Sequence, residues 1–454
     1  MSHPEPTVGT AAGPPSGASP DDASYAAAVA ALFARRPERM LPGLERIAAL
    51  ADRLGHPERA APLVHLTGTN GKSTLARMVS SLLISHGLTT GTYTSPHLQD
   101  VRERIRINGR PISRSDLLAD LAALTPHLDA VEAARGELVT FFETLTALAY
   151  RRFAAAGVDA SVVEVGMGGR WDATNIGDAD VAVVNPVGLD HAELGSTLAE
   201  VAAEKAGIIA EGSTCVVADQ DEVAARVVDR AARARGATQL LAGRDFGIEE
   251  RVPHTTGQQL TLRVGAVTIE RIGLPLLGSH QADNAAVALA AASALLGGVD
   301  PRAVRAGFEA VESPGRLEIV GAQQPGEPPV VLDGAHNPVG ASALAAALDA
   351  DFGGRRRVLV LAAMGDKDCA GIVDALLPVA DAVVATEAPT GRSAPADHLG
   401  KLCRLAGREA EVQPDHGAAL LRARQLATDD AVVVVTGSLY LVGAVRDALG
   451  LRVT

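Results

Sequence analysis

Short apolar runs alternate with amphipathic segments along most of the chain. Runs rich in Val, Leu and Ile predict strands at residues 62–67, 89–94, 160–165, 181–185 and 214–218. Helical periodicity covers residues 25–54, 72–86, 140–156 and 197–206. Strands that are apolar on both faces and separated by helices indicate a mostly parallel sheet with helices on both sides.

The pattern changes after residue 240 and indicates a second unit. Residues 240–275 alternate in short segments typical of antiparallel strands, and an Ala-rich helix is expected at 283–296. Pro and Gly gather at 313–329, and strands are then predicted at 330–333, 357–362, 382–386 and 431–436. We therefore expect a disordered tail at 1–23, an α/β domain at 24–312 and a smaller α/β domain at 313–454.

Composition narrows the class of protein. The formal net charge is −13, which argues against a general binder of nucleic acid or of acidic membranes. Three scattered cysteines favour reduced thiols in the cytoplasm over disulfides or a zinc site. We find no signal peptide, and the apolar stretch at 285–299 is too short to span a bilayer.

Lysine is scarce in this chain. Of the 41 basic residues only Lys72, Lys205, Lys367 and Lys401 are lysines. Because arginine supplies most positive charges, a retained lysine hints at chemistry that a guanidinium cannot perform. Mutational bias that left four accidental lysines is the alternative.

The strongest local motif predicts a phosphate-binding loop. An apolar strand leads into a glycine turn, and a helix opens at Lys72. Backbone N–H groups of such a turn bind phosphate oxygens, Lys72 can reach the β- and γ-phosphates, and the Ser73 or Thr74 hydroxyl can meet Mg²⁺ or phosphate. Only two residues separate the glycines, where the usual pattern has four. The predicted nucleotide-binding residues here are Gly68, Thr69, Asn70, Gly71, Lys72, Ser73 and Thr74.

The shortened loop GTNGKS resembles the Mur ligase superfamily, and further motifs resemble its folylpolyglutamate synthase/dihydrofolate synthase members. These motifs, in family order, are TSPHL (94–98), EVGMGGR (164–170), DATN (172–175), LDH (189–191), EKAGI (204–208), SPGR (313–316) and DGAHNP (333–338). The resemblance implies an N-terminal P-loop ATPase domain, a C-terminal Rossmann-like domain and an active site between them.

The resemblance also implies the reaction and its components. ATP would phosphorylate a carboxylate of dihydropteroate or of a folate, and the amine of L-glutamate would then displace phosphate. The expected partners are these small molecules, with two Mg²⁺ ions, no nucleic acid and no membrane, and the chain is expected to act as a monomer. Whether both the dihydropteroate and the folate activities are present stays open.

Four residues match the family's metal ligands. Ser95, Glu164 and His191 follow or end predicted strands, where open α/β sheets gather ligands. A turn serine and a surface-loop histidine are the alternatives for Ser95 and His191, whereas a carboxylate in an apolar strand such as Glu164 needs a partner. Lys205 matches a lysine that the family carbamylates to bind the second Mg²⁺. Its alternative is a surface lysine paired with an acidic neighbour.

Four further residues match positions that contact the nucleotide. The resemblance places Asn284 against adenine, Asp333 on the ribose, and Arg316 and His336 on the phosphates. We expect Lys72, Lys205, Arg316 and His336 to act in catalysis. A strand-end turn for Asp333 and a helix-start residue for His336 are the alternatives, and Asn337 is interpreted as the helix N-cap.

The folate pocket is expected from two segments and two accessory features. The matching residues are Thr140, Phe141, Phe142, Glu143, Trp171, Asp172 and Ala173. Trp171 could stack on a flat ring or serve only in packing. Residues 101–105 are expected to form a basic strand near anionic substrate, and Lys367 is a candidate for binding glutamate.

Two other functions compete with the folate ligase. A Mur-type ligase for a cell-wall precursor would carry an N-terminal nucleotide-sugar domain, and only about 60 residues precede the phosphate loop. A regulatory nucleotide-binding module would not need Lys205, Asp333 or His336.

Overall fold

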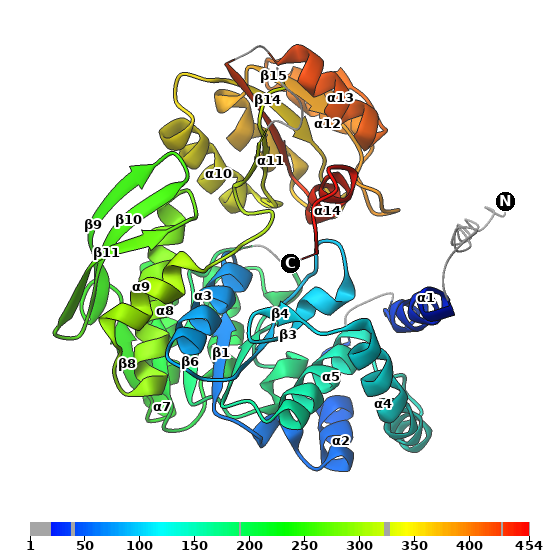
Figure 1. Ribbon diagram of the computed structural model, residues 1–454. Coiled ribbons are helices and arrows are strands. Elements are labelled where there is room, and N and C mark those ends of the chain that lie inside the picture. The colour runs from blue at the N-terminus through cyan, green and yellow to red at the C-terminus, as the bar shows by residue number, and fades with distance from the viewer. Residues whose placement is uncertain (1–19, 38–40, 190–191, 322–326, 428–429, 454) are drawn as a thin grey trace.

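The chain folds into two α/β lobes (Figure 1). The computed structural model describes residues 20–37, 41–189, 192–321, 327–427 and 430–453. Helix α1 (Pro20–Phe33) begins inside the segment that we expected to be a disordered tail, so residues 20–23 differ from that expectation. Its sequence is rich in alanine, which favours helix, and the Tyr25 hydroxyl anchors it by donating to Asp100 at 2.6 Å.

The larger lobe is built on an eight-stranded sheet in the order β4-β3-β2-β5-β1-β6-β7-β8. The run of strands β2-β5-β1-β6-β7-β8 pairs in parallel throughout, and β3 and β4 add an antiparallel edge next to β2. This arrangement confirms the predicted, mostly parallel sheet. The strands are β1 (Leu63–Thr67), β2 (Thr90–Tyr93), β3 (Ile105–Ile107), β4 (Arg110–Pro111), β5 (Ala160–Glu164), β6 (Val181–Val184), β7 (Thr214–Val217) and β8 (Thr238–Leu241).

Helices cover both faces of this sheet because alternate strand residues point to opposite sides. On one face, Val64 and Leu66 pack with helices α3 (Lys72–Ser85), α8 (Ser279–Leu296) and α9 (Pro301–Glu309). The other face is covered by α1, α2 (Glu45–Leu54), α4 (Arg114–Arg135), α5 (Phe141–Ala156), α6 (Leu198–Lys205) and α7 (Glu222–Ala234). A small antiparallel sheet of β9 (Phe246–His254), β10 (Gly257–Val264) and β11 (Val267–Leu274) packs on α8 and α9.

The smaller lobe has a six-stranded sheet in the order β12-β13-β17-β14-β15-β16. All pairs are parallel except β12 with β13. Its strands are β12 (Glu318–Val320), β13 (Val330–Leu332), β14 (Arg356–Leu361), β15 (Ala382–Ala385), β16 (Glu411–Val412) and β17 (Ala431–Thr436). Helices α10 (Pro338–Asp351), α11 (Cys369–Leu376) and α12 (Ala396–Leu405) cover one face, and α13 (His416–Leu426) and α14 (Leu439–Ala448) cover the other.

Two local predictions were wrong. Residues 101–104 form a 3₁₀ helix instead of a strand, because Asp100 and Glu103 make a capping box that tightens the backbone before β3 begins. Residues 25–54 form two helices and not one continuous helix. The remaining short 3₁₀ helices are η1 (Pro57–Arg59), η3 (Ala173–Ile176), η4 (Ala192–Leu194), η5 (Ala206–Ile208) and η6 (Leu377–Val379).

Two other expectations concern cysteines and membrane spans. All three cysteines are buried and form no disulfide, as the sequence indicated. None of the helices in the described ranges is long and apolar enough to cross a membrane.

Candidate active site

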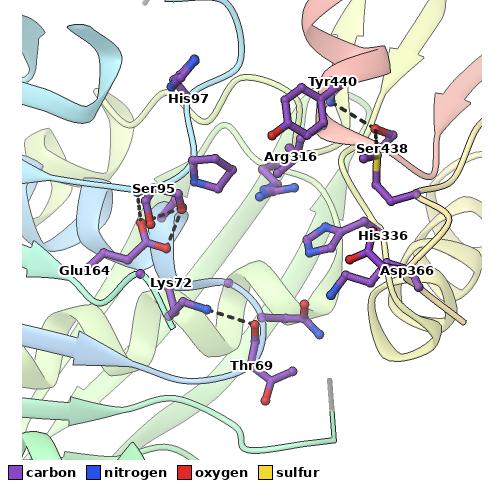
Figure 2. A pocket seen from close by; sticks show the side chains of 18 of the residues that line it. Thr69, Lys72, Ser95, His97, Glu164, Arg316, His336, Asp366, Ser438 and Tyr440 are labelled. Carbon is purple, nitrogen blue, oxygen red and sulfur yellow. Dashed lines mark hydrogen bonds between the residues drawn. The ribbon is translucent and has the colours of Figure 1, made fainter. Parts of the chain in front are cut away.

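A cavity of about 260 Å³ lies between the two lobes (Figure 2). Residues from the ends of β1, β2 and β5 line it on the side of the larger lobe. The smaller lobe contributes the opposite wall. The residues that line the cavity are Thr69, Asn70, Gly71, Lys72, Ser73, Ser95, Pro96, His97, Glu164, Gly166, Arg316, His336, Met364, Asp366, Lys367, Arg392, Ser438, Leu439 and Tyr440.

The predicted phosphate loop joins β1 to α3 at this cavity. Gly68 and Gly71 have φ angles of 146° and 80°, which non-glycine residues rarely adopt. A Cβ at Gly71 would lie 2.9 Å from Oδ1 of Asn284, so the backbone also leaves no room for a side chain. A side chain of the larger lobe fixes the loop backbone, since Nδ2 of Asn185 donates to the Asn70 carbonyl oxygen at 3.0 Å. The geometry confirms a strand, a tight glycine turn and a helix N-terminus in sequence.

Two lysines converge under this loop. Nζ of Lys72 donates to the carbonyl oxygens of Gly68 and Thr69 at 2.9 and 3.2 Å. Nζ of Lys205 donates to the same Gly68 oxygen at 2.8 Å, and the Lys205 side chain is buried. The interpretation of Lys205 as an exposed surface lysine is therefore wrong. A small second cavity is lined by both lysines together with Gly166, Met167 and Gly168.

A buried carboxylate lies next to the loop. Glu164 is 1% exposed and accepts hydrogen bonds from the Ser73 hydroxyl at 2.8 Å and from the Ser95 backbone N–H at 3.0 Å. Burial raises the pKa of the Glu164 carboxyl, and the Lys72 ammonium and the Ser95 and Ser73 donors act in the opposite direction. The strand neighbours β2, β5 and β1 thus place Ser95, Glu164 and Ser73 together.

These groups suit a magnesium ion in chemical type. Carboxylate and hydroxyl oxygens are the ligands that Mg²⁺ prefers. In the described part of the chain, no cluster of three or more His, Cys, Asp or Glu side chains is arranged to hold a metal. His191, the remaining expected ligand, lies outside the described residues. Thr74 is not among the residues that line the cavity, and its buried hydroxyl pairs with that of Ser313 at 2.7 Å.

The smaller lobe presents basic side chains to the phosphate loop. Arg316 and His336 line the cavity as expected, and Nδ1 of His336 lies 2.8 Å from the Gly334 carbonyl oxygen. Asp333 is buried behind them, where its carboxylate accepts the N–H groups of Leu317 and Ala335 at 2.9 and 2.8 Å. Burial raises the pKa of Asp333, while Arg316 lowers it. Asp333 therefore organises the turn that carries Arg316 and His336.

Asn284 and Asp333 are not among the residues that line the cavity. Asn284 is buried on α8, where Oδ1 accepts from Asn185 and Nδ2 donates to Gln281. Both residues support the loop and the turn from behind. Their predicted contacts with adenine and ribose stay predictions.

Several cavity residues were missed in the sequence. Asp366 and Arg392 form an ion pair at 2.9 Å beside Lys367, and Ser438 caps α14 ahead of Tyr440. Each follows the carboxyl end of a strand in the second sheet, which is the one signal that could have located them.

The first predicted folate segment is held by structural contacts. Thr140 and Glu143 form a capping box at the start of α5, and Glu143 also pairs with Arg46 at 3.0 Å. Phe141 stacks on Phe33 with ring centroids 5.2 Å apart, and the Arg36 guanidinium lies 4.8 Å from the Phe141 centroid. Phe142 packs against Gly166, which lines the cavity. Phe142 thus borders a residue of the cavity, Phe141 is buried in the core, and Thr140 and Glu143 set the helix start.

The second folate segment has one exposed and two buried members. Trp171 is 38% exposed, so its ring is accessible. Asp172 is buried and accepts from the Met167 N–H at 2.8 Å and from the Thr174 hydroxyl at 2.6 Å. Burial raises the pKa of Asp172, and these donors lower it. Ala173 is buried in the core that also holds Phe141.

Comparison with known proteins gives consistent matches over both lobes. Residues 66–292 match the Mur ligase middle domain, and residues 315–439 match the Mur ligase glutamate ligase domain. The chain is 40% identical to the dihydrofolate synthase/folylpolyglutamate synthase of Mycobacterium tuberculosis, over 97% of this chain and 99% of the relative.

Two solved structures share the fold. The folylpolyglutamate synthase of Mycobacterium tuberculosis complexed with ADP matches with a TM-score of 0.91 and 39% identity, over 96% of this chain and all of that one. Escherichia coli FolC in complex with DHPP and ADP matches with a TM-score of 0.84 and 32% identity, over 94% and 97% of the two chains.

Proposed function

The chain belongs to the Mur ligase family, among the dihydrofolate synthases/folylpolyglutamate synthases, and from this membership we infer an ATP-dependent ligase that joins L-glutamate to a folate. The observation that carries the inference is the interlobe cavity, which has a phosphate loop on one wall and Arg316, His336 and Lys367 on the other. The cell-wall ligase and the regulatory module are set aside, because the relatives that match over nearly the whole chain are folate ligases.

We propose that the first step transfers the γ-phosphoryl group of ATP to a carboxylate of the acceptor. A carboxylate oxygen attacks phosphorus, the bond to the β–γ bridging oxygen breaks, and ADP and an acyl phosphate form. The phosphate loop and Lys72 bind the phosphates, with Lys72 moving from the Gly68 and Thr69 carbonyl oxygens to the phosphate oxygens. Arg316 and His336 face the loop and stabilise the charge on the transferred group.

The second step forms the amide bond. The neutral amine of L-glutamate attacks the acyl carbon, phosphate leaves, and the amine proton is released to solvent. Lys367 and Arg392 line the same cavity and offer positive charge to the glutamate carboxylates, whereas Asp366 pairs with Arg392 and favours the ammonium side of the amino acid. A cationic cavity in a chain of net charge −13 supports this assignment of anionic substrates.

Two Mg²⁺ ions complete the proposed site. Glu164, Ser73 and Ser95 would hold one ion beside the phosphate loop, where the metal would neutralise charge on the phosphates. His191 stays a proposed ligand of this ion, and a carbamylated Lys205 stays a proposed ligand of the second ion. Carbamylation joins the neutral Lys205 amine to CO₂ with loss of a proton, and its anionic product would relieve the repulsion between two ammonium groups that share the Gly68 oxygen.

The acceptor is proposed to enter beside α5. Phe142 and Trp171 would offer ring surfaces, the buried Phe141 would support them from the core, and Asp172 would hold the segment that carries Trp171. We propose both a folate and dihydropteroate as acceptors, since the Escherichia coli structure was solved with DHPP. Asn284 and Asp333 remain the proposed neighbours of the adenosine group.

The test is glutamate-dependent phosphate release with ATP and Mg²⁺, run separately with dihydropteroate and tetrahydrofolate. We expect release with both acceptors, none without glutamate, and a product heavier by one glutamyl unit in mass spectrometry. Release that does not depend on either acceptor would overturn the proposed function.

We also propose that the chain works as a monomer in the cytoplasm. The family resemblance supports the monomer, and the three cysteines, which are buried thiols as is typical of reducing compartments, support the cytoplasm. Sedimentation velocity of the purified enzyme tests the first point.

A further inference from the structure

Two asparagine side chains join the phosphate loop to the smaller lobe. Nδ2 of Asn337 donates to Oδ1 of Asn70 at 3.1 Å, and Nδ2 of Asn70 donates to Oδ1 of Asn337 at 3.3 Å. Asn70 lies in the phosphate loop, whereas Asn337 directly follows His336 at the start of α10. We propose that Asn337 is a positioning residue that sets the phosphate loop from the smaller lobe. The proposal rests on the nucleotide-binding function proposed above.

Asn70 is held from both lobes at once. Its backbone carbonyl accepts from Asn185 of the larger lobe, which also donates to Asn284 at 3.1 Å. Its side chain pairs with Asn337 of the smaller lobe. The first contact is independent of lobe alignment, and the second exists only when the lobes are aligned. The loop is therefore fully ordered only in the aligned arrangement, which is the one that brings His336 to the phosphates.

Asn337 has a structural role that must be separated from this one. Its Oδ1 accepts the Gly340 N–H at 2.7 Å and caps α10, and the side chain is buried. Serine and aspartate cap a helix about as well as asparagine does. A side-chain amide carries its donor and its acceptor on two separate atoms, as the reciprocal pair with Asn70 requires, whereas the shorter serine or threonine side chain carries both on one oxygen and a carboxylate only accepts. Capping of α10 alone therefore does not require a side-chain amide at position 337.

Other contacts keep the lobes together without this pair. The Thr74 hydroxyl bonds to Ser313 at the start of the interlobe segment, and Gln99 accepts from Arg446 and donates to Asp447 at 2.9 and 2.7 Å. Loss of the asparagine pair should therefore loosen the phosphate loop without separating the lobes. The expected effect is on nucleotide affinity and not on folding.

The decisive variant is Asn337→Ser, which keeps the helix cap and cannot reach Asn70. We expect its affinity for ADP and for a non-hydrolysable ATP analogue, measured by calorimetry without folate, to fall about tenfold. Asp415→Ser is the matched control, because Asp415 caps α13 through the Ala418 N–H and does not line the cavity. It should bind nucleotide as the wild type does, with a similar small change in melting temperature.

A double-mutant cycle then tests whether the two asparagines act as one unit. Asn70→Ala should weaken binding as Asn337→Ser does, and the double variant should be no weaker than either single variant. Wild-type affinity of Asn337→Ser, or effects that multiply in the double variant, would overturn the proposal. Turnover of the wild-type enzyme with a folate tests the proposed function separately, because the double-mutant cycle compares only the nucleotide affinities of the variants with that of the wild type.

Discussion

Replacing Glu164 by glutamine should separate the fold from the metal chemistry. The change preserves the shape of a side chain that is 1% exposed and removes its negative charge. The glutamine oxygen can keep the bond from the Ser95 N–H. Its amide nitrogen can donate to the Ser73 hydroxyl, which then donates to the Ser95 carbonyl oxygen, now 3.3 Å away. No buried polar group is left without a partner.

The magnitude follows from these bonds. Hydrogen bonds to a charged group contribute about 1.5–3 kcal/mol and neutral ones about 0.5–1.5 kcal/mol, so weakening two bonds costs about 2 kcal/mol. Removing a buried charge, whose cost is shown by the raised pKa of Glu164, offsets much of this. We expect the free energy of unfolding to stay within about 1 kcal/mol of the wild type.

The effect on stability should depend on pH in a defined direction. A carboxyl with a raised pKa binds its proton more tightly in the folded state, so folding stability falls as pH rises from the unfolded pKa to the folded pKa. Above that range the wild type bears the full cost of the charge and the glutamine variant does not. In buffer with EDTA, the variant should therefore gain stability relative to the wild type as pH rises from 4 to 8.

The same Glu164→Gln substitution should lower activity, although it stabilises the fold at higher pH. Loss of groups around a metal ligand costs about 10–100-fold in metal affinity, so loss of the ligand itself should raise the Mg²⁺ requirement by at least about 100-fold. The assay is phosphate release against Mg²⁺ concentration, with melting temperature measured on the same samples. A variant that needs no more Mg²⁺ than the wild type would refute the assignment of Glu164.

A second buried glutamate provides the contrast. Glu103 accepts the backbone N–H groups of Leu98, Gln99 and Asp100, all at 2.8 Å. The nitrogen of a glutamine there cannot accept, so at least one N–H loses its partner at a cost of about 1–3 kcal/mol. Glu103→Gln should lower the melting temperature where Glu164→Gln does not. Equal destabilisation by the two variants would contradict the hydrogen-bond argument.

Three further substitutions test other residues. Lys72→Ala should lower kcat in phosphate release by at least about 100-fold, because the phosphate site loses its charged donor; normal turnover would rule out the phosphate loop. Lys205→Arg should be nearly inactive in the same assay although it keeps the charge, since guanidinium cannot form a carbamate, and wild-type rates would remove that modification. Trp171→Ala should raise KM for the folate roughly fivefold with little change in melting temperature, because the ring is 38% exposed; a large loss of stability with unchanged KM would make it a packing residue.

Local pattern predicted the elements whose signals lie in a few consecutive residues. The phosphate loop could be placed because a strand, two glycines and a helix start follow one another within about ten residues. The helices predicted at 140–156 and 197–206 were visible for the same reason, and in the structure each begins with a capping box. Helix α4 escaped prediction, since it carries a proline, Pro126, in its interior and its apolar residues form no clear stripe.

The pairing of distant segments could not be derived from periodicity. Ser95, Glu164 and Ser73 meet because β2, β5 and β1 are neighbours in the sheet, an order that differs from their order in the chain. The contact between Asn70 and Asn337 likewise depends on how the two lobes pack, and the sequence indicated only that Asn337 caps a helix. The family resemblance indicated which residues share a site, and the structure supplies the contacts.

The scarcity of lysine acquires a physical meaning once the lysines have positions. Lys72 and Lys205 donate to one carbonyl oxygen under the phosphate loop, and Lys367 lines the cavity between the lobes. Only Lys401 lies on an exposed helix surface. A compact ammonium fits a narrow space beside a glycine turn and can lose its proton, whereas a planar guanidinium is larger and stays charged. Three of four lysines in a chain that otherwise uses arginine therefore lie where an arginine would change either the geometry or the chemistry of the site.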